Sequence, residues 1–133
     1  MGSYVAYEVS KLMTKKRIKI AKANILIMGL TFKENCPDHR NTKVIDLVNE
    51  FKSFSCNVDV YDPWVNKKNV ADEYKIDPID EPIKGKYDVI VIAVAHNEFK
   101  LLSEDLIRSY GKSNHILYDI KYLLKQNESD GRL

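Results

Sequence analysis

Residues 29–42 form the segment best equipped to bind an anion. It reads Gly-Leu-Thr-Phe-Lys-Glu-Asn-Cys-Pro-Asp-His-Arg-Asn-Thr. Lys33 and Arg40 stand seven residues apart in it. A lysine offers a phosphate a point charge, whereas an arginine offers two parallel hydrogen-bond donors. The ring of Phe32 is suited to stacking on a base or a ribose. The alternative is that Lys33 is simply solvated and that Arg40 pairs with Asp38.

Neither of the two common glycine-rich phosphate motifs occurs in this segment. Gly29 is its only glycine, so it does not match G-x-G-x-x-G, and no G-K-[ST] follows, so it is not a P-loop. Backbone groups are therefore not predicted to cradle a pyrophosphate. Binding would rely on side-chain charge, helped at Arg40 by the free N–H groups of a predicted helix start.

Three further residues each follow a predicted strand. Asp62 precedes Pro-Trp, and an acidic residue at such a position often binds a ribose hydroxyl, the alternative being a helix N-cap. Lys121 is placed to approach an anion held by Lys33, the alternative being an ordinary surface lysine. His96 brings a titratable ring to the same edge, the alternative being a polar loop residue that caps the next turn.

The two cysteines, Cys36 and Cys56, are too few for a disulfide scaffold and lack the spacing of metal ligands. Cys36 has only His39 as a local partner, which is weak support for a nucleophile. Cys56 reads as a small core residue. The sequence therefore predicts neither a catalytic residue nor a metal site.

Apolar periodicity predicts the elements that must position these residues. Residues 1–22 are predicted as a helix with an apolar stripe made of Val5, Val9, Leu12, Met13 and Ile20. Short, continuous apolar runs then predict strands over residues 24–29, 57–62, 87–94 and 115–119. Helices are predicted between them, over residues 40–54, 66–74 and 101–110, the last one closed by Gly111.

This alternation predicts an α/β fold, a three-layer Rossmann-like parallel sheet preceded by an N-terminal helix. Ligands of such sheets bind outside the carboxyl ends of the strands, where all the candidate residues fall. Residues 23–125 form the expected binding domain. Residues 126–133 are polar and are expected to be a frayed tail.

Composition sets the broad class. The chain has 133 residues and 15.4 kDa, with 44% hydrophobic and 30% charged residues, which is typical of one globular domain. A net charge of +2 gives no support for a nucleic-acid or membrane partner. No apolar run approaches the roughly 18 residues of a membrane span, and no signal peptide is visible, so a cytoplasmic protein is expected.

Residues 29–43 resemble the opening of the C-terminal, UDP-binding domain of the nucleotide-sugar 6-dehydrogenases, the UDP-glucose/GDP-mannose dehydrogenase family. The pattern is G-L-x-F-K, then D-x-R, then Asn or Ser leading into a helix. Further similar stretches follow in order at residues 61–63, 93–99 and 118–121. The stretches Pro-Asp-His-Arg-Asn-Thr and Ala-His-Asn-Glu-Phe are most similar to the sequences of the UDP-N-acetylhexosamine branch of this family.

The resemblance implies roles for individual residues. Phe32, Lys33 and Lys121 would bind the UDP-sugar, and Arg40 would reach the pyrophosphate of NAD. Many members of the family carry Arg where this chain has Lys121, so one two-pronged donor is lost there. Residues 1–22 would be the end of the helix that joins the two halves of these enzymes.

The resemblance also implies that much of the enzyme lies outside this chain. Family members oxidise the sugar C6 alcohol to a uronic acid, used for surface polysaccharide, through a thiohemiacetal on a cysteine in a Ser-Cys-Phe-Pro-Lys segment. That segment and G-x-G-x-x-G do not occur here. NAD is thus expected to bind mainly to the absent N-terminal half, and this chain alone is predicted to be inactive.

The expected partners are a UDP-sugar, the N-terminal half of the same enzyme and, through the linker helix, a second copy that would make a homodimer. Two alternatives remain open. One is a non-catalytic nucleotide-binding or assembly domain with the same Rossmann-like fold. The other is a free-standing regulatory nucleotide binder.

Overall fold

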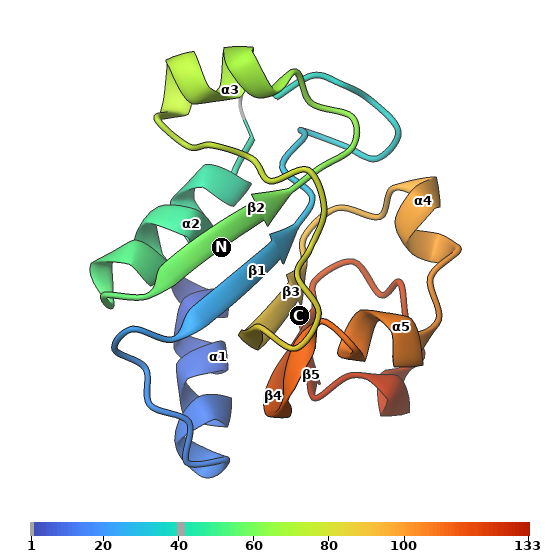
Figure 1. Ribbon diagram of the computed structural model, residues 1–133. Helices are drawn as coiled ribbons and strands as arrows, with labels where there is room; N and C mark the ends of the chain where they lie inside the picture. The colour runs from blue at the N-terminus through green and yellow to red at the C-terminus, as the bar shows by residue number, and fades with distance from the viewer. Residues whose placement is uncertain (1, 40–41) are drawn as a thin grey trace.

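The computed structural model describes residues 2–39 and 42–133, and Figure 1 shows them as a single sheet between two layers of helices. Every strand pair in the sheet is parallel, and the strand order is β2-β1-β3-β4-β5. The strands are β1 (Asn24–Met28), β2 (Asn57–Tyr61), β3 (Tyr87–Ile92), β4 (Gly111–Asp119) and β5 (Gly131–Arg132). The predicted fold class is confirmed.

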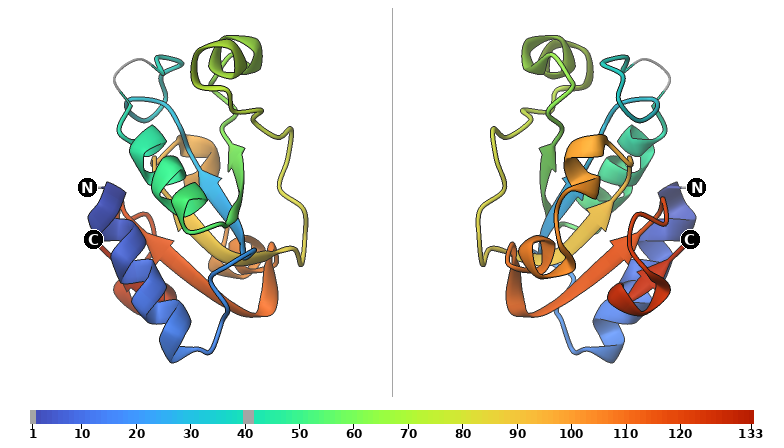
Figure 2. Two further views of the ribbon diagram at one scale, coloured as in Figure 1. Left: turned by 90° about the vertical axis from the view of Figure 1, so that its left-hand side faces the viewer. Right: turned by 90° about the vertical axis from the view of Figure 1, so that its right-hand side faces the viewer.

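The helices divide between the two faces and one end of the sheet. They are α1 (Gly2–Lys15), α2 (Val44–Ser53), α3 (Lys67–Tyr74), α4 (Asn97–Lys100) and α5 (Glu104–Arg108), with a 3₁₀ turn η1 (Gln126–Glu128). Helices α1 and α2 pack together on one face, and α4 and α5 lie on the other (Figure 1). Helix α3 lies beyond the carboxyl end of β2, which both Figure 1 and Figure 2 show. No helix in the described residues has the length and apolar character to cross a membrane.

The core explains why the strand sequences are continuously apolar. Every residue of β3 is buried, as are the last four of β1, because helices cover both faces of the central strands. Two apolar clusters result, one on each face. The cluster under α1 and α2 includes Val5, Val9, Val48, Phe51 and Ile27. The other includes Leu26, Ile90, Phe99 and Ile107.

The helix predicted over residues 1–22 is too long, because α1 ends at Lys15. Arg17 takes the left-handed conformation, with φ 59°, and its N–H group donates to the carbonyl three residues back at 3.1 Å. The N–H group of Ile18 reaches the carbonyl of Met13 at 2.9 Å. These two bonds are a Schellman motif, which ends a helix without glycine here. Ile18 and Ile20 still pack on the core, from outside the helix.

The helix predicted over residues 101–110 is also corrected. The range contains the shorter helix α5, while α4 is a separate helix before it, and the side chain of Ser103 caps α5 by accepting from the N–H group of Leu106 at 3.1 Å. Gly111 begins β4 rather than closing a helix. Helix α2 begins at Val44, later than the predicted residue 40, and the strands predicted at residues 24–29, 57–62 and 87–94 are confirmed to within two residues.

The expectation of a frayed C-terminal tail is wrong. Strand β5 pairs with the end of β4, and the tail lies beside α1 (Figure 2). Asp130 holds it there, because its carboxylate accepts from the N–H group of Leu117 at 2.7 Å and pairs with Arg108 at 3.2 Å. These contacts join residues far apart in sequence, so the polar composition of the tail does not predict them.

Candidate functional site

Four strands, β1 to β4, end at the edge of the sheet where the sequence places the candidate residues. Strands β1 and β4 flank β3, and all three run parallel, so their carboxyl ends meet at one edge. The chain leaves β1 through Gly29, whose φ is +103°. A Cβ atom there would lie 2.6 Å from the Cβ atom of Val94. Only glycine therefore lets the loop after β1 pass so close to the turn after β3.

Phe32 and Lys33 lie in the loop after β1 with exposed side chains, and 58% of Phe32 is accessible to solvent. Lys121 is exposed two residues after the end of β4, where its N–H group donates to the Asp119 carboxylate at 3.1 Å. Two strand spacings separate the axes of β1 and β4, about 10 Å. The structure thus brings the two predicted lysines to one edge of the sheet.

The charges of these two lysines are available to a ligand. Within residues 2–39 and 42–133, neither Lys33 nor Lys121 takes part in an ion pair. Arg40, the predicted NAD-binding residue, lies outside the described residues, and so does its suggested pairing with Asp38. The described edge therefore offers two cations and an exposed aromatic ring.

Asp62 has neither of the two roles that the sequence suggested for it, which were ribose binding and capping of a helix N-terminus. It is only 4% exposed, so its carboxylate is not presented to a ribose, and helix α3 is capped by Asn66 instead. The carboxylate accepts from the N–H groups of Leu30 at 2.7 Å, Thr31 at 3.1 Å and Trp64 at 2.7 Å. It thus ties the end of β2 to the beginning of the loop after β1.

Hydrogen bonding keeps the Asp62 carboxyl ionised in spite of its burial. Desolvation by itself would raise its pKa. The hydrogen bonds from His96 and from the backbone N–H groups of Leu30 and Trp64 outweigh that effect and hold the pKa below its ordinary value. The buried edge therefore contains a fixed negative charge, which is matched by donors in the segments that follow three adjacent strands, β2, β1 and β3.

His96 is wholly buried, and its ring does not cap the turn that follows it. Its Nε2 atom lies 2.9 Å from the Asp62 carboxylate, and its Nδ1 atom accepts from the N–H group of Asn35 at 2.9 Å. Sequence reasoning placed Asp62 and His96 at the same edge but did not pair them. The available signal was that each follows a strand of a parallel sheet.

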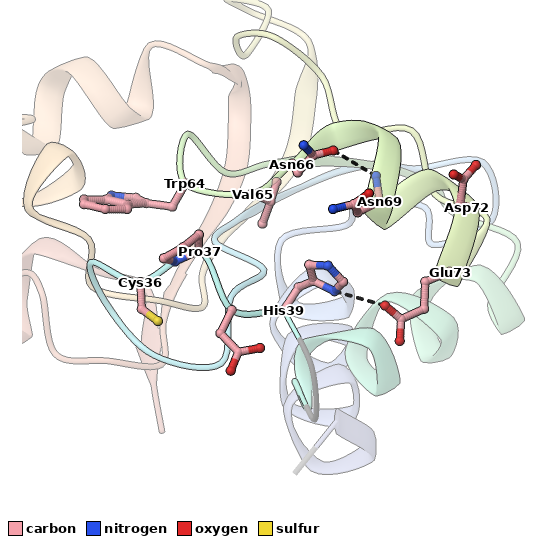
Figure 3. A pocket seen from close by; sticks show the side chains of 10 residues that line it. Cys36, Pro37, His39, Trp64, Val65, Asn66, Asn69, Asp72 and Glu73 are labelled. Atoms are coloured by element: carbon pink, nitrogen blue, oxygen red, sulfur yellow. Dashed lines mark hydrogen bonds and ion pairs between the residues drawn. The ribbon is translucent and has the colours of Figure 1, made fainter.

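A cavity of about 970 Å³ lies between the end of the loop after β1 and helix α3 (Figure 3). Its lining includes Cys36, Asp38 and His39 on one side and Trp64 and Glu73 on the other. His39 Nδ1 lies 3.2 Å from a carboxylate oxygen of Glu73. The lining does not include Phe32, Lys33 or Lys121. The acidic residues of the described lining are Asp38, Asp72 and Glu73.

The loop after β1 does not fit the dinucleotide site of a Rossmann fold. Such a site needs a tight glycine-rich turn that brings the pyrophosphate to a helix N-terminus. Here, residues 29–43 separate β1 from α2, and Gly29 is the only glycine among them. The loop after β1 therefore lacks the glycine pattern of such a site.

The model of the UDP-glucose/GDP-mannose dehydrogenase family, UDP binding domain, matches residues 26–126. The chain is 52% identical over 133 residues to a UDP-N-acetyl-D-glucosamine 6-dehydrogenase from Pseudomonas aeruginosa, covering all of this chain and 32% of that protein. It is 48% identical to the enzyme of the same name from Salmonella typhi, covering 31% of it. The chain thus spans about a third of the length of these curated relatives.

Solved structures show the same fold at lower sequence identity. A UDP-D-ManNAc dehydrogenase from Pyrococcus horikoshii superimposes with a TM-score of 0.80 at 24% identity, over 98% of this chain and 30% of that one. An NDP-N-acetyl-D-galactosaminuronic acid dehydrogenase from Methanosarcina mazei gives a TM-score of 0.82 at 18% identity, over 96% of this chain and 26% of that one.

Proposed function

We propose a function from one premise: this chain belongs to the UDP-glucose/GDP-mannose dehydrogenase family, as its UDP binding domain. The domain binds the UDP portion of a nucleotide sugar at the carboxyl edge of its sheet. Lys33 and Lys121 attract the diphosphate, and Phe32 packs against the uridine. The work of this chain is to position the substrate, and the oxidation takes place with groups outside it.

The placement of Lys33 and Lys121 is the observation that carries the proposal. Both side chains are exposed, they come from strands on either side of β3, and neither takes part in an ion pair with any described residue. Two like charges at one edge of the sheet repel each other weakly across water. A bound diphosphate removes that repulsion and gains two charge-assisted contacts.

The parent protein, in this proposal, oxidises a UDP-N-acetylhexosamine at C6, and UDP-N-acetyl-D-glucosamine is the first candidate. The identities of 52% and 48% to enzymes named for that substrate support this choice. NAD is bound mainly by the part of the parent protein outside this chain, with Arg40 as a contact to its pyrophosphate. This chain alone then reduces no NAD when it is given UDP-N-acetyl-D-glucosamine.

Calorimetric titration of the chain with UDP tests the binding function. We expect weak binding, with a Kd of about 1 mM, because part of the site is missing. Lys33→Ala and Lys121→Ala should each weaken the binding of UDP and leave the much weaker binding of uridine unchanged. Lys52→Ala, an exposed lysine on α2, is the matched control. Equal affinity for UDP and uridine would contradict a diphosphate-binding role.

A second candidate function is assembly through α1. Tyr4 and Tyr7 are 54% and 58% exposed on this helix, although its opposite face is buried in the core. A second copy of the chain that covers these rings would make a dimer. Sedimentation of the wild-type chain and of Tyr4→Ala tests this. Dimer formation without any UDP binding would favour an assembly domain over a substrate-binding one.

A further inference from the structure

We propose that His96 and Asp62 are positioning residues for the UDP site, and that His96 acts as the neutral tautomer that carries its proton on Nε2. The proposal rests on the function proposed above, since it concerns the loop that bears Phe32 and Lys33. Neither His96 nor Asp62 reaches the surface, because their side chains are 0% exposed. They act on the ligand only through the loop that they hold.

The contacts of His96 assign its tautomer. Nδ1 lies 2.9 Å from the backbone nitrogen of Asn35, and a backbone N–H group can only donate. Nδ1 must therefore present a lone pair, so it carries no proton. A neutral ring then has its proton on Nε2, which lies 2.9 Å from the acceptor oxygen of Asp62. The hydroxyl oxygen of Thr31, 3.2 Å from Nε2, is a second acceptor for that proton.

The two side chains hold the loop on both sides of Phe32 and Lys33. On the near side, Asp62 accepts from the N–H groups of Leu30 and Thr31. The Thr31 hydroxyl donates in turn to the carbonyl of Lys33 at 2.9 Å. The backbone immediately before and at Lys33 is thus tied to the end of β2. These donors are buried, so the loss of their acceptor would leave them without a hydrogen bond.

On the far side, His96 fixes Asn35. The Nδ1 atom of His96 accepts from the N–H group of Asn35. The side-chain oxygen of Asn35 in turn accepts from the N–H group of Asn97 at 2.8 Å. Asn35 is in the left-handed conformation with φ 55°, which is costly for most residues and needs such support. The loop after β1 is therefore tied to the turn after β3 at this point.

Aromatic side chains keep His96 from turning. The ring of Trp64 stacks against it at a centroid distance of 6.0 Å and an interplanar angle of 27°. Phe99 contacts it edge-on at 5.3 Å. A loop that is held in this way before the ligand arrives loses less conformational freedom on binding, which strengthens binding without any direct contact.

Two substitutions of His96 separate its two hydrogen bonds. In His96→Asn, the side-chain oxygen takes about the place of Nδ1 and can still accept from the N–H group of Asn35, but the contact to Asp62 is lost. In His96→Gln, the amide can reach Asp62, but Asn35 loses its acceptor. We expect His96→Gln to weaken UDP binding about tenfold and His96→Asn to weaken it clearly less.

A control variant whose thermal stability is similar to that of His96→Gln separates an effect on the position of the loop from an effect on folding. Ile107→Val makes a small hole in the apolar cluster under α5. It should lower the melting temperature of the chain and leave its UDP affinity unchanged. Hydrogen exchange of the Asn35 amide should be faster in His96→Gln than in wild type, Ile107→Val or His96→Asn. Equal losses of affinity in His96→Gln and Ile107→Val would overturn the proposal.

The tautomer is read directly from the imidazole ¹⁵N spectrum of the wild-type chain. At neutral pH we expect an unprotonated Nδ1 and a protonated Nε2 on His96. A charged ring or the opposite tautomer would overturn the proposal, even if His96→Gln does not fold. If the wild-type chain binds no UDP, the proposed function of this chain fails, whereas the ¹⁵N spectrum and the exchange of the Asn35 amide still decide whether His96 holds the loop.

Discussion

The carboxylate of Asp62 and the imidazole of His96 meet 2.9 Å apart across the end of β1, although their own strands are not neighbours in the sheet. The loop that leaves β1 runs over this pair and is bonded to both side chains. A buried hydrogen bond between side chains that follow β2 and β3 thus supports the exposed loop that follows β1, the strand between them. The consequences can be measured in stability as well as in binding.

The stability of the chain should fall in acid partly because of Asp62. Its pKa is lower in the folded chain than the ordinary value of about 3.9. Asp62 therefore stabilises the fold fully above about pH 5, and this contribution is lost as the pH falls through its folded-state pKa. Asp62→Asn should be less stable at neutral pH and should lose less stability on acidification. Urea unfolding at several pH values between about 2 and 7 measures both effects.

Asp77→Asn, which changes an exposed carboxylate, is the matched control for that experiment. Acid sensitivity that remains in Asp62→Asn is expected in part from Asp130. Burial would raise the pKa of that carboxyl, but hydrogen bonds from Leu117 and Arg108 lower it instead. An Asp62→Asn variant with the acid profile of wild type would contradict the assignment.

Gly29→Ala should destabilise the fold by at least about 2 kcal/mol. The added methyl group would lie 2.6 Å from the Cβ atom of Val94 and 2.8 Å from its backbone nitrogen, and the backbone is already at φ +103°. Gly85→Ala is the control, because Gly85 has a positive φ of 73° but no atom within 4 Å of an added Cβ. That variant should cost only about 1 kcal/mol. Similar free energies of unfolding in the two variants would show that the close approach at Gly29 is unimportant.

Asp130→Ala should cost about 1–3 kcal/mol of folding free energy. The substitution leaves the N–H group of Leu117 without its acceptor at 2.7 Å and removes a partner of Arg108. Denaturant unfolding measures the loss, and exchange of the Leu117 amide should become faster. Asp105→Ala, an exposed carboxylate on α5, should change the stability little. The view that the tail is part of the fold would be abandoned if Asp130→Ala were as stable as wild type.

Lys121→Arg should bind UDP more tightly than wild type, by a factor on the order of three. A guanidinium group can donate two parallel hydrogen bonds to a phosphate, whereas the ammonium group of a lysine acts as a point charge. The exposed side chain has room for the larger group. Titration with UDP measures the change, with Lys52→Arg as the control for added arginine. Unchanged or weaker binding would place Lys121 away from the diphosphate.

The sequence predicted the structure best for strands that are buried on both faces. Strand β3 and the end of β1 could be predicted because a strand covered on both faces must be apolar at every position. The family resemblance rested on short stretches at strand ends, and the family match confirms it. The sequence also predicted that Lys33 and Lys121 lie at the same edge of the sheet, because parallel strands that alternate with helices bring their carboxyl ends together.

Only the tertiary structure decided where α1 ends, that the C-terminal tail is part of the fold, and which side chains support the loop after β1. The stop at Lys15 depends on a left-handed Arg17, which carries no strong sequence signal. Strand β5 is two residues long and depends on its pairing with β4 and on the contact of Arg108 with Asp130, the residue before the strand. Asp62 and His96 are 34 residues apart, and local pattern carries no information about such a contact. The sequence thus determined which segments are buried, whereas the pairing of polar groups between strand ends depended on the folded arrangement.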